Sequence, residues 1–177
     1  MRVEQCLKPF FLCIVALCAF EAPAWTATRD QPDAMTSRNE AAIRGLIDGF
    51  VRAIRARDVK GVMSVFAPDV VSFDVGPPLQ HGGGEAFVKR WKELFDAYQG
   101  PIQYEVQDLA ITTRDDVAFS HSLNRIAGTL KNGRETDRWL RWTAGYRKVD
   151  GKWLIVHEQV SVPVDVKSGK ALLDLKP

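Results

Sequence analysis

The sequence predicts an α+β fold, because helical patterns fill its first half and strand patterns fill its second half. Apolar residues recur at helical spacing between Ile43 and Ile54. From residue 102 onward, long segments rich in β-branched and aromatic residues are separated by Asn132-Gly133 and Asp150-Gly151. Such pairs are typical of tight β-hairpin turns. Helices followed by hairpins indicate helices packed on an antiparallel sheet.

The composition limits the possible classes of protein. The chain has 177 residues, of which 46% are hydrophobic and 26% charged, and its formal net charge is +2. One folded domain is expected at this length. The hydrophobic content excludes a disordered chain, and the near-zero charge provides no large basic surface for nucleic acid.

Residues 1–24 have the pattern of a signal peptide. Arg2 and Lys8 precede an apolar run over residues 9–20, and the small residues 22–24 follow it. A run of this length is too short to span a bilayer, which needs about 20 residues. We therefore expect export to the periplasm or the medium, with no membrane association after cleavage. The cysteines Cys6, Cys13 and Cys18 all lie in this segment, so the mature chain is expected to use no thiol chemistry.

The mature chain is predicted to begin with a flexible leader, residues 25–36. Ser37 and Glu40 have the spacing of a capping box that starts the first helix. The apolar stripe of this helix consists of Ile43, Leu46, Ile47, Phe50, Val51 and Ile54. Asp58 is predicted to cap a second helix that ends at Ala67-Pro68.

The remaining elements follow in order. A short strand is expected at residues 70–75 and a third helix from Glu85 to Tyr98, before Gly100. Four long strands are expected at residues 102–113, 117–130, 136–148 and 152–164. The folded domain is thus predicted to span residues 37–165, followed by a C-terminal tail, residues 166–177.

The strand between Trp139 and Tyr146 has apolar residues on both faces. A sheet with one solvated face normally alternates between apolar and polar residues. We therefore expect helices on one face and a second subunit on the other, as in a homodimer. Packing of Trp139 under a loop or the C-terminal tail is the alternative.

Several short motifs resemble those of the nuclear-transport-factor-two-like superfamily, and of its SnoaL-like and ketosteroid-isomerase-like branch in particular. The motifs are residues 57–63 (RDVKGVM), 66–69 (FAPD), 73–76 (FDVG) and 150–158 (DGKWLIVHE). The resemblance implies a cone-like fold, in which three N-terminal helices pack in a curved antiparallel sheet around a pocket. It says little about chemistry, because this fold supports many functions.

Asp74 occupies the position of the proton-shuttling base in ketosteroid isomerases, which the resemblance makes a candidate catalytic residue. In those enzymes a tyrosine and a protonated aspartic acid hold the oxyanion. Phe50 and Ala144 stand at about those positions here, and neither donates a hydrogen bond. A true ketosteroid isomerase is therefore not expected, while other proton transfers remain open. Asp74 is equally compatible with a turn cap before Gly76-Pro77.

Other candidate residues follow from strand alternation. His121 shares a face with Leu123 and Arg125, and a pocket on that face would use His121 in proton transfer and Arg125 in binding. The alternative places His121 in the core and Arg125 at the rim. The resemblance also places Glu158 inside the cavity, with Val156 and Val160, and His157 outside or toward a partner subunit. A register shifted by one residue would exchange the positions of Glu158 and His157. Phe50, Trp91 and Trp142 complete the predicted lining.

Two functions remain open from the sequence. One is cofactor-free proton transfer, as in an isomerase or hydratase, on a small hydrophobic molecule, with Asp74 as acid or base. The other is a non-catalytic ligand-binding or oligomerisation module, similar to the association domain of calcium/calmodulin-dependent kinase. His121, Asp74 and Glu158 have the donor types of a metal site, but their spacing follows no metal motif, so no metal is expected.

Overall fold

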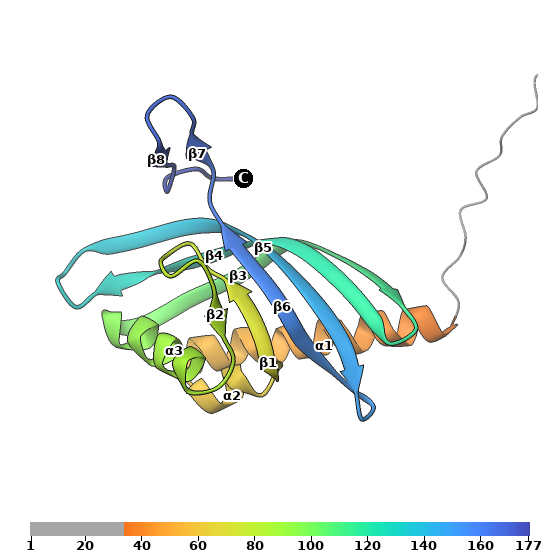
Figure 1. Cartoon of the computed structure of the whole chain (residues 1–177). Helices are drawn as coiled ribbons and strands as arrows, with labels where there is room; N and C mark the ends of the chain where they lie inside the picture. Colours follow the sequence, from red (N-terminus) through yellow and green to blue (C-terminus); the bar gives the residue numbers. More distant parts are fainter. Residues whose placement is uncertain (1–33) are drawn as a thin grey trace, which may run out of the picture. The chain divides into compact units, whose positions relative to one another are not determined.

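A computed structural model describes residues 34–177 of the chain (Figure 1). The predicted signal peptide and most of the predicted leader lie outside these residues. The helices are α1 (Ala34–Ala56), α2 (Val59–Met63) and α3 (Glu85–Ala97). The strands are β1 (Phe66–Phe73), β2 (His81–Gly82), β3 (Tyr98–Arg114), β4 (Val117–Leu130), β5 (Glu135–Val149), β6 (Lys152–Ser161), β7 (Val164–Asp165) and β8 (Lys170–Ala171). No helix within residues 34–177 has the length and apolar composition that crossing a membrane requires.

The first helix begins three residues earlier than the predicted capping box. Ala34 is already helical, so Ser37 lies inside α1 and residues 34–36 are not part of a flexible leader. Glu40 does not reach back to the helix start, because its carboxylate accepts from Arg44 at 2.6 Å, one turn further on. The first residues of α1, Ala34 and Met35, are strong helix formers and favour this earlier start.

The segment after α2 is a strand where the sequence predicted helix. The helix ends at Met63, and Phe66, the first residue of β1, pairs with Ile155 of β6. Pro68 lies where the register between the two strands shifts. Proline lacks the N–H that a regular ladder needs, so this irregular stretch accommodates it. Asp58 is the N-cap residue of α2 as predicted, although its side chain makes no capping hydrogen bond.

The α+β fold class is confirmed. Six strands form one sheet in the order β2-β1-β6-β5-β4-β3, and β3 to β6 are the predicted antiparallel meander. One pairing departs from the prediction, because β1 runs parallel to β6. A parallel pair needs a long connection, and α3 and four strands (β2 to β5) supply it here. β7 and β8 form a separate two-stranded hairpin, which includes the predicted domain end at residue 165 (Figure 1).

The core lies between the sheet and the helices. α1 buries Ile43, Ile47, Phe50 and Ile54 against the inner face of the sheet. Arg55 ties this helix to β3, because its Nε and Nη2 donate to the Tyr104 carbonyl at 2.9 and 2.6 Å. With α1 held in this way, the inner faces of β4, β5 and β6 remain partly uncovered toward α3, and the cavity forms there.

Candidate functional site

A cavity of about 170 Å³ lies between the inner face of the sheet, α1 and α3. Most of its wall is apolar: Phe50, Phe87, Trp91, Leu94, Leu140 and Trp142. A dry cavity of about 150 Å³ is enough for one benzene ring. The size and lining therefore suit one ring or a short apolar chain.

Phe50 is the centre of the aromatic wall. Its ring stacks on Trp142 with centroids 5.6 Å apart and meets Trp91 edge-on at the same distance. Phe66 and Tyr104 contact it edge-on from two further sides. Because these rings fix one another, the cavity wall has a defined shape without a bound ligand.

The structure places five of the eight predicted site residues on the cavity. These are Phe50, Asp74, Trp91, Trp142 and Glu158.

The other three predicted residues do not reach the cavity. His121 is exposed on the outer face of the sheet, and Leu123 and Arg125 share that face. The prediction that they line the pocket is wrong, because the opposite face of β4 points inward. Arg125 is held on the outside by Asp137 at 2.7 Å and Glu105 at 2.8 Å.

The inner face of β4 carries small polar residues that sequence reasoning missed. Ser120, Ser122 and Asn124 are all buried. The Ser120 hydroxyl lies 2.8 Å from the Tyr146 hydroxyl, and Ser122 donates to Asn124 at 2.7 Å. Each polar group thus has a partner, which makes its burial tolerable. In the sequence these residues are recognisable only as polar residues at every second position of the strand. That pattern does not show that they are buried, because their burial depends on the hydrogen-bond partners.

Glu158 is the carboxyl group buried deepest on the cavity wall. It is 4% exposed, and its Oε1 and Oε2 accept hydrogen bonds from Ser72 at 2.9 Å and Trp142 Nε1 at 2.8 Å. Burial raises its pKa to about 7, and the negative charge of Asp74 adds to the effect. The two hydrogen bonds oppose this shift because they stabilise the carboxylate. Glu158 is therefore a carboxyl group that can both take and release a proton near neutral pH.

The inward position of Glu158 depends on an irregularity in β6. Gly145 pairs with His157 while Tyr146 pairs with Ile155, so Val156 is an extra residue in the ladder. Ile155 is fully buried and Val156 is only half-buried, which corrects the predicted inward position of Val156. A bulge of this kind reverses the alternation along a strand. His157 lies outside as predicted, with its Nδ1 2.8 Å from the Val71 carbonyl oxygen.

Asp74 lies at the rim, where β1 ends. Its Oδ2 is 2.8 Å from Arg90 Nη2 on α3, and its Oδ1 accepts from the Val75 amide at 2.7 Å. Both interpretations of the sequence are therefore partly realised, since Asp74 faces the cavity and also binds the backbone of the following turn. Its ion pair connects the end of β1 to α3.

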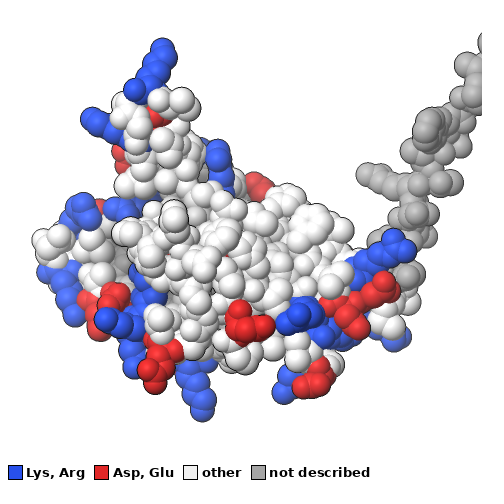
Figure 2. Space-filling model, in the orientation of Figure 1, with Lys and Arg blue, Asp and Glu red and all other residues white. Residues whose placement is uncertain are grey.

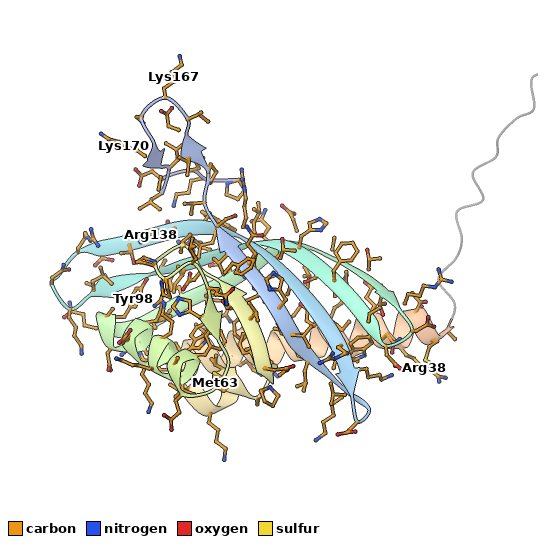
Figure 3. The ribbon with its side chains drawn as sticks, in the orientation of Figure 1. Arg38, Met63, Tyr98, Arg138, Lys167 and Lys170 are labelled. Carbon is orange, nitrogen blue, oxygen red and sulfur yellow. The ribbon has the colours of Figure 1, made fainter. Side chains whose placement is uncertain are left out.

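Four further polar residues of the cavity were not anticipated: Tyr98, Tyr104, Asn124 and Arg138. Asn124 Nδ2 donates to the Tyr104 hydroxyl at 2.8 Å, which leaves the proton of Tyr104 free for another acceptor. Burial raises the pKa of Tyr104 well above its ordinary value, so the phenol keeps its proton. Figure 3 shows Tyr98 and Arg138 near the same end of the sheet, where β4 turns into β5. Over residues 34–177 no three His, Cys, Asp or Glu side chains gather in the manner of metal ligands.

Comparisons with known proteins agree with this architecture. The family model of the SnoaL-like domain matches residues 43–165. The crystal structure of an NTF2-like protein of unknown function from Pseudomonas putida KT2440 is 34% identical, covers 80% of this chain and 99% of its own, and has a TM-score of 0.73. No curated protein matches the chain.

Two more distant solved structures share the fold. A ketosteroid isomerase-like protein from Erwinia carotovora atroseptica is 22% identical, covering 68% of this chain and 93% of its own, with a TM-score of 0.59. A protein with a cystatin-like fold from Nostoc punctiforme is 17% identical, covering 71% and 91%, with a TM-score of 0.60. On the family match and the conserved architecture together, the chain belongs to the SnoaL-like domain family of the NTF2-like superfamily.

Proposed function

We propose that the chain binds a small, mostly apolar organic molecule in the cavity and moves a proton on it, with Glu158 as general acid and base. The observation that carries this proposal is the carboxyl group of Glu158, which is buried in an aromatic cavity and has a pKa of about 7. A catalytic acid or base works best when its pKa lies near the working pH. The reaction class is isomerisation, hydration or dehydration without a cofactor.

The chemistry needs one base and one donor. Glu158, as a carboxylate, takes a proton from a carbon next to a carbonyl group, and the electron pair moves to the carbonyl oxygen. The free proton of the Tyr104 hydroxyl provides a hydrogen bond to that enolate oxygen. Glu158, now a carboxylic acid, returns the proton to a different carbon or to a leaving hydroxyl. Tyr104 thus supplies from β3 the kind of donor that Phe50 cannot supply from α1.

Proton transfer can be tested without knowing the natural substrate. Phenylacetone carries one ring and acidic protons next to its carbonyl, and NMR in D₂O follows their exchange for deuterium. We expect the wild-type protein to accelerate exchange, with a rate that rises through about pH 7 as Glu158 ionises. Glu158→Gln should slow exchange by roughly 100-fold or more. Glu93→Gln, which changes an exposed glutamate outside the cavity on α3, should leave the rate unchanged.

Two outcomes would contradict this assignment. If Asp74→Asn abolishes exchange and Glu158→Gln does not, Asp74 is the base, as the sequence pattern suggests. If phenylacetone binds and no variant alters its exchange, the cavity serves binding alone.

A second role, self-association, is favoured by the outer face of the sheet. Phe73, Val117 and Phe119 are 39%, 59% and 50% exposed there. Figure 2 shows few charged residues on the sheet face over β6 and β5. Apolar patches of this kind commonly mark contacts with other proteins. A homodimer that pairs these faces remains our proposal, as does export of the chain through residues 1–24.

Analytical ultracentrifugation tests the proposed dimer. We expect the wild-type protein to sediment as a dimer and Phe119→Asp to sediment as a monomer, because the substitution places a charge within the paired faces. The exposed valine of the separate hairpin, Val166, provides the control, and Val166→Asp should leave the dimer intact. A monomeric wild type would refute the dimer, and a larger ring would favour the assembly module.

A further inference from the structure

Arg138 is a cation on the cavity wall that has no partner within residues 34–177. Its side chain makes no ion pair and no hydrogen bond there, and it is half-buried. The other cavity arginine, Arg90, is paired with Asp74 at 2.8 Å. A partly buried charge without a partner is unfavourable unless water or a bound anion compensates it. Of the two cavity arginines, Arg138 is therefore the one whose charge is available to pair with a bound anion.

Glu158 cannot serve as the missing partner. Arg138 lies on the inner face of β5, six residues before Ala144, which pairs with Glu158. Six residues of extended chain span roughly 20 Å. The cavity consequently has a cationic end at Arg138 and an acidic end at Glu158, with Leu140 and Trp142 between them.

A phenol also lines the cationic end. The Thr136 hydroxyl donates its one proton to the Gly128 carbonyl at 2.9 Å, and its Oγ1 lies 3.3 Å from the Tyr98 hydroxyl, which positions the phenol on the cavity wall. Thr136 and Arg138 alternate onto the same face of β5 as Leu140. The guanidinium of Arg138 can bind both oxygens of a carboxylate by itself, because arginine binds carboxylates through two parallel hydrogen bonds.

We propose that the molecule bound in this cavity is a small organic carboxylic acid, whose carboxylate pairs with Arg138 while its apolar body lies against Leu140, Trp142 and Phe50. This inference rests on the proposed function, since it names the class of ligand for the same cavity. The apolar body points toward Glu158, and the carboxylate remains at the end of the cavity where Arg138 is half-buried. Arg138 is a binding residue in this arrangement and takes no part in proton transfer.

Matched acids and amides test the proposal. The probes are phenylacetate, 3-phenylpropionate and 4-phenylbutyrate, each paired with its neutral amide of nearly equal shape. Binding is measured by quenching of tryptophan fluorescence and by calorimetry. We expect the best acid to bind the wild-type protein about tenfold or more tightly than its amide, because only the acid forms a charge-assisted pair. Arg138→Gln should remove this preference by weakening acid binding and leaving amide binding unchanged.

Arg141 provides a matched control on the same strand. It faces outward, is exposed and also has no partner within the described chain. Arg141→Gln changes the net charge by the same amount, so it should keep the preference for the acid. Thermal unfolding of both variants verifies that the fold is retained.

The outcomes separate the two proposals. Equal binding of acid and amide to the wild-type protein overturns the carboxylate assignment and leaves ligand binding in the cavity standing. A preference that survives Arg138→Gln assigns the carboxylate to another cation and overturns the role of Arg138. To test the cavity itself, Leu140→Trp fills it, and Leu123→Trp makes the same change on the outer face. If no probe binds the wild type, or if both variants bind every probe equally well, the proposed function fails together with this inference.

Discussion

Between pH 4.5 and about pH 7 the wild-type protein should lose roughly 3 kcal/mol of unfolding free energy through Glu158 alone, and Glu158→Gln should not lose it. The folded state raises the pKa of this carboxyl group from 4.5 to about 7. In that pH range the folded chain retains the proton and the unfolded chain releases it. The unfolded state therefore binds fewer protons, and stability falls as the pH rises. Below pH 4.5 and above about pH 7 this contribution no longer varies.

Glutamine is a suitable replacement because its amide can satisfy both existing partners. Its oxygen accepts from Trp142 Nε1, and its NH₂ group faces the Ser72 hydroxyl, which can accept as well as donate. The measurement is urea unfolding of both proteins at intervals from pH 4 to pH 8. The difference between their free energies isolates the contribution of Glu158.

A second variant tests the cause of the shift. Ser72→Ala removes one donor to the carboxylate, so the pH at which stability stops falling should move upward. Parallel stability curves for the wild type and Glu158→Gln would contradict the raised pKa and weaken the case for Glu158 as the base.

Phe50→Ala should destabilise the protein by about 3–5 kcal/mol, the range for truncating a buried phenylalanine. Phe50 is 2% exposed and contacts the rings of Phe66, Trp91, Tyr104 and Trp142. The ligand cavity adjoins it, so the surroundings cannot collapse to fill the space that the ring leaves. Chemical unfolding monitored by circular dichroism measures the loss.

The matched control lies on the same helix. Met35 is 55% exposed near the start of α1, and Met35→Ala should change stability by less than about 0.5 kcal/mol. A loss below about 1 kcal/mol for Phe50→Ala would mean that the aromatic wall rearranges when the ring is removed. The cavity would then lack the fixed shape on which selective binding depends.

The sequence by itself determined the fold class, the order of the elements and the family. The apolar stripe of α1 follows helical spacing closely enough that Ile43, Phe50 and Ile54 could be assigned to the core. Asn132-Gly133 and Asp150-Gly151 lie between paired antiparallel strands, as tight turns of this type require. Each of these features involves residues that are close together in the sequence, so the sequence alone is enough to recognise it. The resemblance to SnoaL-like proteins added the inward position of Asp74 and Glu158.

Only the tertiary structure decided which face of each strand points inward. Alternation along β4 separates His121 from Ser122 but does not say which of them is buried, and the more apolar set was the wrong choice. Ser120 and Asn124 are buried because Tyr146 and Tyr104, which lie on other strands, provide their hydrogen bonds. The bulge at Val156, and the lack of a partner for Arg138 among residues 34–177, likewise depend on neighbours distant in sequence. Burial of a polar residue depends on such partners, and the fold alone brings them together.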